Sequence, residues 1–315
     1  MADAIAVGVF GLGLLGHPVA MRLQEQGLDP QVFEPLQHMA RHHLIRGGTG
    51  VMASAAVVAQ SCDILLVAMD DDAAVRDIAL GPTGFVPHVR PGAVVVDMAS
   101  ADPGLTRAIG RALVPNGATI VDAPLSGTAE DAEAGRLTIF CSGRADALDR
   151  CEPVLRALAQ RIVRAGDTPG AARAVQSIAR LYGAANLAAA AEALLIGRRF
   201  GIEPAATAEA IGVLAAEVGA PPPALAAEVL PRRFESGYRL DQLIADMDAA
   251  LTIAGRDGTP APLSRLAREI VAAARLAFPA ARDHSEFVRW QETTAQAALG
   301  GEGDGTSMGA GVPKP

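Results

Sequence analysis

Six residues near the N-terminus have the spacing of a phosphate-binding loop. A Gly-x-Gly-x-x-Gly motif at residues 11–16 follows an apolar run and precedes a helical pattern. Its first glycine permits a tight turn, its second permits a pyrophosphate to approach the backbone, and its third permits close helix packing. The N–H groups at the start of the helix then favour the anion. The residues expected to contact a dinucleotide here are Gly11, Leu12, Gly13, Leu14, Leu15 and Gly16.

A single acidic residue, Glu34, closes the second apolar run of the chain. A carboxylate at the end of the second strand of a dinucleotide-binding domain accepts hydrogen bonds from the ribose hydroxyls of NAD and repels the 2′-phosphate of NADP. Pro35 and Leu36 follow it, rather than an arginine that could hold that phosphate. We therefore expect Glu34 to bind the ribose and NAD to be preferred, with NADP as the alternative cofactor.

The loop and Glu34 require a sheet to position them, and the first half of the chain has the pattern of one. Apolar runs alternate with helical segments, which indicates a parallel sheet covered by helices on both faces. Strands are predicted at residues 5–10, 31–34, 50–52, 64–69, 94–98, 119–123, 137–141 and 161–165. Helices are predicted between them at residues 18–26, 53–60 and 145–159.

The pattern changes at residue 170, where an Ala/Leu-rich run predicts one helix of about eight turns up to residue 200. Further helices are predicted at residues 204–218, 223–229, 240–254, 262–277 and 285–298. The expected fold class is α/β, with a Rossmann dinucleotide-binding domain over residues 1–166. An all-α domain follows over residues 167–299, and its long first helix is expected to line an interdomain cleft. Residues 300–315, rich in Gly and Pro, predict a disordered tail.

The composition argues against several classes of protein. The net charge of −8 and the pI of about 5.3 disfavour nucleic acid as a partner. The longest apolar stretch contains Glu192 and is too short to span a bilayer, so no membrane partner is expected. Three cysteines without metal spacing and the lack of an export signal predict a cytoplasmic protein with reduced thiols. His38 and His42 lie one helical turn apart without a third ligand in register, so no metal site is expected.

Three motifs resemble those of the β-hydroxyacid dehydrogenase family, which includes 3-hydroxyisobutyrate and tartronate semialdehyde dehydrogenases. They lie at residues 9–20, 97–103 and 122–128, and the resemblance extends from about residue 7 to residue 298. Leu15 stands where methionine is usual, and Thr128 where a second glycine is usual. The resemblance implies that Met69, Asp70 and Ser100 lie near the cofactor.

The third motif resembles the family's substrate-binding signature. A serine hydroxyl and neighbouring backbone N–H groups can hold a carboxylate. The resemblance therefore implies that Ser126, Gly127 and Thr128 bind the substrate.

The family's catalytic lysine is missing from this chain. In the family, a Gly-rich turn leads into a helix that carries a lysine and, one turn later, an asparagine. Alignment on Gly170 places Gln176 at the lysine position, and the only lysine of the chain is Lys314 in the expected tail. A second family lysine is replaced by Ala245, which is followed by Asp246.

This loss changes the chemistry that the resemblance implies. The lysine serves the family as general acid/base and stabilises negative charge on the reacting oxygen. Gln176 can donate a hydrogen bond but cannot transfer a proton at ordinary pH. Arg173 and Arg180 share a helix face with it, and either could bind a substrate carboxylate. The remaining candidates for carrying the proton are Tyr238, Asp246 and His284.

Together these features predict a homodimeric or larger NAD(P)-dependent oxidoreductase that transfers a hydride to or from a 3-hydroxy acid or semialdehyde. The long helix is apolar all round, which favours the oligomer. Gln176 and Ser126 are the predicted catalytic residues. The predicted substrate-binding residues are Ser126, Gly127, Thr128, Arg173, Gln176, Arg180 and Tyr238. Asp246 is also predicted to contact the cofactor.

Two alternatives remain open. An imine reductase would suit the missing lysine, because an iminium substrate is already positively charged, although such enzymes usually favour NADPH and Glu34 favours NAD. A dinucleotide-binding pseudoenzyme would have kept the fold and lost the reaction.

Overall fold

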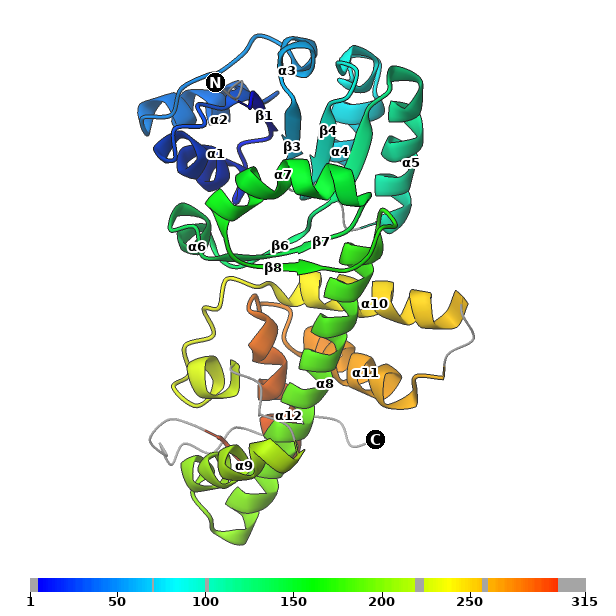
Figure 1. Cartoon of the computed structure of the whole chain (residues 1–315). Coiled ribbons are helices and arrows are strands. Elements are labelled where there is room, and N and C mark those ends of the chain that lie inside the picture. The colour runs from blue at the N-terminus through cyan, green and yellow to red at the C-terminus, as the bar shows by residue number, and fades with distance from the viewer. Residues whose placement is uncertain (1–4, 70, 100–101, 219–223, 257–259, 300–315) are drawn as a thin grey trace. The chain divides into compact units, whose positions relative to one another are not determined.

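A five-stranded parallel sheet forms the centre of the N-terminal part of the chain (Figure 1). The computed structural model describes residues 5–69, 71–99, 102–218, 224–256 and 260–299. The strands are β1 (Val7–Phe10), β2 (Gln31–Phe33), β3 (Ile64–Val67), β4 (Val94–Asp97) and β5 (Thr119–Asp122), in the order β2-β1-β3-β4-β5. All residues of β1, β3 and β4 are buried, as expected for strands between two helical layers. The predicted parallel sheet is confirmed.

Helices cover both faces of this sheet, because successive side chains of a strand point to opposite faces. Val94 and Val96 pack in one cluster with α1 (Gly16–Glu25) and α7 (Ala145–Leu158). Val95 packs in another cluster, on the opposite face. Its helices are α3 (Ala55–Ser61), α4 (Asp72–Leu80) and α5 (Pro103–Leu113). Helix α2 (Gln37–Ile45) follows β2.

The strand predicted at residues 50–52 is wrong. Val51 forms only an isolated parallel bridge with Val32, whose N–H donates to the Gly50 carbonyl at 2.8 Å. Gly50 has a φ of +73°, so the chain is not extended there and no longer ladder forms.

A second, three-stranded sheet carries the predicted substrate-binding segment. Its strands are β6 (Leu125–Ser126), β7 (Leu137–Cys141) and β8 (Ala159–Arg164). Strand β6 runs antiparallel to β7, and β8 runs parallel to it. The short helix α6 (Ala129–Glu133) joins β6 to β7. The strand predicted at residues 161–165 therefore begins two residues earlier than expected.

The C-terminal part of the described chain is helical, as predicted. Its helices are α8 (Ala171–Phe200), α9 (Pro204–Val218), α10 (Leu240–Arg256), α11 (Pro262–Ala277) and α12 (Val288–Ala295). Two of the predicted helices differ from the observed elements. The described part of the helix expected at residues 223–229 is a π-helical turn at Leu225–Val229, and α12 is preceded by a 3-10 turn at His284–Phe287. The hydrophobic core of the C-terminal helices includes Leu187, Leu194, Met247, Val271 and Phe287.

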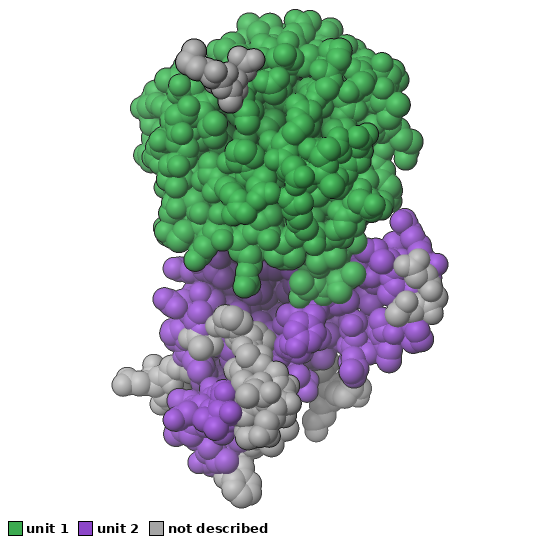
Figure 2. Space-filling model, viewed as in Figure 1, with its two compact units in different colours: residues 1–179 green, residues 180–315 purple. Residues whose placement is uncertain are grey.

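Two compact units make up the chain, residues 1–179 and residues 180–315 (Figure 2). The division lies inside α8, because the start of this helix is bonded to the first unit. Ala172 N–H donates to Ser142 Oγ, and Arg173 N–H donates to Asp122 Oδ2, both at 3.0 Å. Within the described ranges, no helix has the length and apolar character needed to cross a membrane. The predicted tail, residues 300–315, lies outside the described residues.

Candidate active site

Two glycines of the loop after β1 lie where any side chain would clash with the backbone or with Met69. Gly11 has a φ of +97°, and a Cβ atom there would lie 2.6 Å from Met69 Sδ. A Cβ on Gly16 would lie 2.3 Å from the Gly11 carbonyl oxygen. Helix α1 begins at Gly16, so its first N–H groups emerge where the loop ends. This cradle fits a pyrophosphate.

Glu34 ties the same loop to the end of β2. Its Oε2 accepts the Leu12 N–H at 2.7 Å, and its Oε1 accepts the Leu36 N–H at 2.9 Å. Glu34 is buried, at 8% exposure, yet a carboxylate has about four lone-pair sites and retains acceptor capacity for ribose hydroxyls. The structure thus brings Glu34, Leu12 and Met69 to the glycine-rich loop. Leu14 is exposed, while Asp70 and Ser100 lie outside the described residues.

A pair of histidines that the sequence did not predict lies next to this loop. His17 Nδ1 in α1 lies 2.8 Å from His43 Nδ1 in α2. Burial lowers the pKa of both rings, and neighbouring histidines lower it further. Helical periodicity suggested a pairing of His38 with His42, and it could not reveal a partner on another helix.

Gln176, on the second turn of α8, is held at both ends of its amide. Its Nε2 donates to the Leu125 carbonyl at 2.8 Å, and its Oε1 accepts from Arg173 Nη1 at 3.1 Å. Gln176 is buried, and the second N–H of its amide has no partner among the described residues. Leu125 directly precedes Ser126 in β6, so the structure brings Gln176 to the predicted substrate segment.

The segment after β6 uses some of its donors locally. Ser126 is half-buried and pairs with Thr138 in β7. Gly127 has a φ of +143°, which favours glycine. Thr128 caps α6: its N–H and its hydroxyl both donate to Asp131 Oδ2, at 3.0 and 2.9 Å. A substrate carboxylate at Thr128 would therefore compete with Asp131.

Two buried carboxylates lie side by side at the ends of neighbouring strands, where Asp97 is in register with Asp122. Asp97 accepts the Thr106 hydroxyl at 2.6 Å, and Asp122 accepts the Arg173 N–H. Burial raises the pKa of Asp122 to about 6, Arg173 opposes the shift, and Asp97 adds to it. Two aspartates that each close a parallel strand are the sequence signal from which this cluster could have been predicted.

In the second unit, three predicted residues form one polar cluster. The Tyr238 hydroxyl donates to Asp246 Oδ2 at 2.6 Å, and Arg180 forms an ion pair with the same oxygen. The Arg180 guanidinium lies over the Tyr238 ring, 4.7 Å from its centroid. Burial raises the pKa of Tyr238; Arg180 opposes this shift and Asp246 adds to it. The His284 ring lies 5.1 Å from the Tyr238 ring, centroid to centroid.

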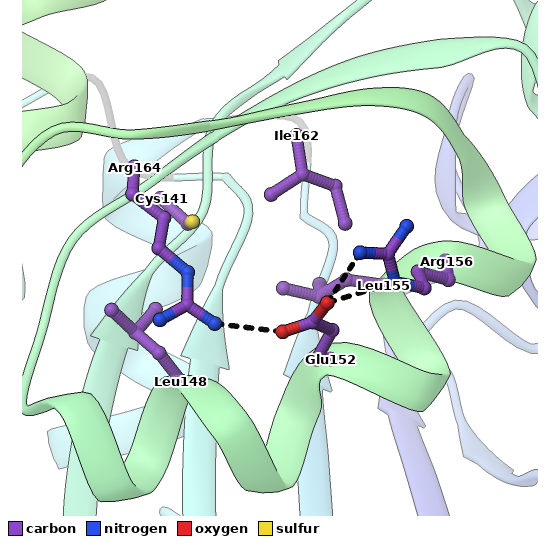
Figure 3. Close-up of a pocket in the computed structure, with 7 residues that line it drawn as sticks. All are labelled: Cys141, Leu148, Glu152, Leu155, Arg156, Ile162 and Arg164. Atoms are coloured by element: carbon purple, nitrogen blue, oxygen red, sulfur yellow. Dashed lines mark hydrogen bonds and ion pairs between the residues drawn. The ribbon is translucent and has the colours of Figure 1, made fainter.

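A separate pocket of about 340 Å³ lies between α7 and the second sheet (Figure 3). Arg156 and Arg164 both bond to Glu152 there, and Arg164 also bonds to Asp149. Its charges are compensated internally, and none of its lining residues is a predicted site residue. We assign no ligand to it.

Among the described residues, no group of three His, Cys, Asp or Glu side chains is arranged to hold a metal ion.

The cradle, the buried carboxylate and the parallel sheet are those of a dinucleotide-binding domain, and the similar proteins below make the chain an NAD(P)-dependent oxidoreductase. A sequence model of the NAD binding domain of 6-phosphogluconate dehydrogenase matches residues 6–166. A model of the NAD-binding domain of NADP-dependent 3-hydroxyisobutyrate dehydrogenase matches residues 170–291. The chain belongs to the β-hydroxyacid dehydrogenase family, as its motifs implied.

Relatives with assigned activities span nearly the whole chain. The 2-(hydroxymethyl)glutarate dehydrogenase of Eubacterium barkeri is 29% identical over 96% of this chain and 100% of its own length. The L-threonate dehydrogenase of Cupriavidus necator is 30% identical over 90% of this chain and 95% of its own.

Solved structures share the fold. The 3-hydroxyisobutyrate dehydrogenase of Mycobacterium tuberculosis has a TM-score of 0.77 at 22% identity, covering 91% of this chain and 99% of that one. An imine reductase from Myxococcus stipitatus has a TM-score of 0.61 at 19% identity, with the same coverage.

Proposed function

We propose that this enzyme interconverts a small 3-hydroxy acid and the corresponding semialdehyde. The observation that carries the proposal is the Gln176 amide, which Arg173 and Leu125 hold beside the Ser126 segment with one N–H left to donate. That N–H would bond to the reacting substrate oxygen. The relatives named for 2-(hydroxymethyl)glutarate and L-threonate support a hydroxy acid.

The cofactor would be NAD in preference to NADP. Buried negative charge at Glu34 supports this preference, because the 2′-phosphate of NADP would be placed against a carboxylate. When bound, the nicotinamide accepts or returns the hydride at C4. The other proposed contacts to the cofactor are Gly11, Leu12, Gly13, Leu14, Leu15, Gly16, Met69, Asp70, Ser100 and Asp246.

The substrate carboxylate would be held by the Ser126 hydroxyl and the Gly127 backbone N–H, and Thr128 would join them only by giving up its bonds to Asp131. Gly127 supports this role, since its positive φ gives the turn a conformation that other residues rarely adopt. Arg180 would add positive charge. Gln176 would stabilise negative charge on the reacting oxygen as a hydrogen-bond donor, not as an acid.

The proton of the substrate hydroxyl requires another carrier, and we assign it to a relay in which the Tyr238 oxygen takes that proton while the Tyr238 hydroxyl passes its own proton to Asp246 Oδ2. The Tyr238 hydroxyl donates to Asp246 Oδ2 at 2.6 Å, and Arg180 contacts both groups. Gln176 cannot take the proton, and an arginine remains protonated.

A second candidate is the reduction of a C=N bond. The observation that favours it is the neutral amide of Gln176 at the lysine position, since a neutral group would tolerate a cationic iminium. Glu34 disfavours an imine reductase, because such enzymes usually use NADPH and a carboxylate at this position favours NAD. Turnover of cyclic imines would be the sign of this activity.

The enzyme would act as a homodimer or larger homo-oligomer in the cytoplasm. Val175 and Ile178 are 37% and 49% exposed on one face of α8, which supports a partner surface there. Cys62, Cys141 and Cys151 are buried and unlinked, which suits a reducing compartment.

The proposal is tested by following nicotinamide absorbance with NAD and NADP. The substrates are L-threonate, 3-hydroxyisobutyrate, L-serine, the matching semialdehydes and cyclic imines. Turnover of a hydroxy acid or semialdehyde is the expected result. Turnover of imines alone would move the assignment to C=N reduction. Cofactor binding without turnover of these substrates, with activity appearing only in Gln176→Lys, would point to a pseudoenzyme.

A further inference from the structure

Arg173 occupies an interior position that is unusual for a substrate-binding arginine. It is 7% exposed, and its guanidinium donates to Gln176 Oε1 at 3.1 Å and to the Met98 carbonyl at 3.4 Å. Its backbone N–H is bonded to the buried carboxylate of Asp122. The side chain is thus engaged with protein groups on several sides.

The Arg173–Gln176 bond joins a permanent cation to the oxygen of a neutral amide. A charged donor makes a hydrogen bond roughly twice as strong as a neutral donor does. Withdrawal of electron density through the amide oxygen makes the amide N–H groups better donors, and hydrogen bonds in a chain strengthen one another. Burial of both residues increases the effect, because the interior screens charge less than water does.

The second acceptor at this amide fixes its orientation. The Leu125 carbonyl takes one N–H at 2.8 Å, so the amide nitrogen must face Leu125 and the amide oxygen must face Arg173. The remaining N–H then has one direction. A flipped amide would set its oxygen against a carbonyl and its nitrogen against a guanidinium, leaving both bonds unmade.

We propose that Arg173 is a positioning residue that supplies the reaction centre with positive charge through the Gln176 amide. The inference rests on the proposed function and deepens it, since it replaces the direct substrate contact first expected of Arg173. The missing lysine would be replaced in two parts. Gln176 would supply the hydrogen bond to the substrate oxygen, and Arg173 would supply the charge one bond behind it. No proton moves through either group.

The experiment compares Arg173→Met, Arg173→Lys and the double variant Arg173→Met/Asp122→Asn with the wild type. Arg111→Met removes an exposed arginine of the same unit and serves as the control. The double variant keeps buried charge balanced, because Asp122 loses its negative charge along with the cation. It therefore separates a role in stability from a role at Gln176.

For Arg173→Met, kcat should fall about 10-fold to 100-fold while the substrate KM changes by less than about threefold. Arg173→Lys should recover part of kcat. The double variant should recover thermal stability without recovering kcat. Recovery of kcat in the double variant would overturn the proposal, because Arg173 would then act only by neutralising Asp122. A raised KM with unchanged kcat would also overturn it and make Arg173 a substrate ligand.

A second readout needs no turnover and distinguishes failure of this inference from failure of the proposed function. The side-chain ¹⁵N resonance of Gln176 is identified by its loss in Gln176→Leu. It should shift in Arg173→Met and in the double variant, return toward its original position in Arg173→Lys, and stay in place in Arg111→Met. An unmoved resonance in Arg173→Met would overturn the inference, even if the wild type is an active dehydrogenase.

Discussion

The Glu34 carboxylate accepts a hydrogen bond from the Leu12 backbone N–H at 2.7 Å, so the residue proposed to select NAD also holds the glycine-rich loop. Its other oxygen accepts the Leu36 N–H at 2.9 Å, so one side chain holds both the loop after β1 and the segment after β2. Charge and hydrogen bonding at Glu34 therefore have separable consequences.

Glu34→Gln should change cofactor preference and lose one of the two backbone hydrogen bonds that Glu34 accepts, because the amide nitrogen cannot accept an N–H. The amide keeps one acceptor oxygen and loses the negative charge, so NADPH should bind about 10-fold more tightly than it does to the wild type. Glu34→Ala removes both acceptors and should weaken NADH and NADPH together by about 10-fold or more. Fluorescence titration with each cofactor gives the Kd values. Unchanged NADPH affinity in Glu34→Gln would show that charge at Glu34 does not select the cofactor.

Gly16→Ala should disrupt the loop. Its Cβ would lie 2.3 Å from the Gly11 carbonyl oxygen, a contact that only backbone movement can relieve. The expected cost is about 1–3 kcal/mol in the free energy of unfolding, with loss of cofactor binding. Gly212→Ala is the control, since a Cβ there meets no atom within 4 Å and alanine favours a helix. If Gly16→Ala binds NADH as tightly as Gly212→Ala does, the loop does not require glycine at position 16.

Residues 64–67 and 94–97 could be predicted as buried strands because every side chain in them is apolar or closes the strand. Helix α11 could be predicted to the residue, since Pro262 begins it and Pro279 follows its end. The glycine-rich loop and Glu34 could also be predicted, because their roles depend on residues that lie close together in the sequence.

Contacts between distant elements could not be predicted in this way. The bonds from Gln176 to Leu125 and from His17 to His43 link separate elements, and no periodicity encodes them. The predicted strand at residues 50–52 failed because a short apolar pattern does not reveal the backbone conformation of Gly50.

Asp122 should make the protein less stable as the pH rises. Its folded pKa is about 6 against an ordinary 3.8, so the folded state binds the proton more tightly than the unfolded state. Its contribution to stability is full below about pH 4 and is lost as the pH rises through 6, a change of about 3 kcal/mol. Asp122→Asn should therefore gain stability relative to the wild type between pH 4 and pH 7. Urea unfolding at several pH values measures this, and parallel profiles for the two proteins would contradict it.

Tyr238→Phe should impair proton transfer while leaving the fold intact. The ring stays under Arg180, and only the hydroxyl bonded to Asp246 is lost. We expect kcat to fall about 100-fold with unchanged NADH affinity, the usual cost of losing a general acid or base. Tyr182→Phe changes the other tyrosine, which is 65% exposed, and should leave kcat unaltered. Equal kcat values for the two variants would remove Tyr238 from the proton route.

The most direct test of the account is the kcat of Gln176→Leu with the best substrate from the screen, measured beside Gln176→Lys. Leucine fills a similar volume and cannot donate a hydrogen bond to the substrate oxygen. If the Gln176 amide stabilises that oxygen, kcat should fall about 100-fold to 1,000-fold in Gln176→Leu, while NADH still binds. Gln176→Lys should retain more activity than Gln176→Leu, because an ammonium group can donate to the same oxygen. A Gln176→Leu enzyme as fast as the wild type would contradict the account and place the reaction centre elsewhere.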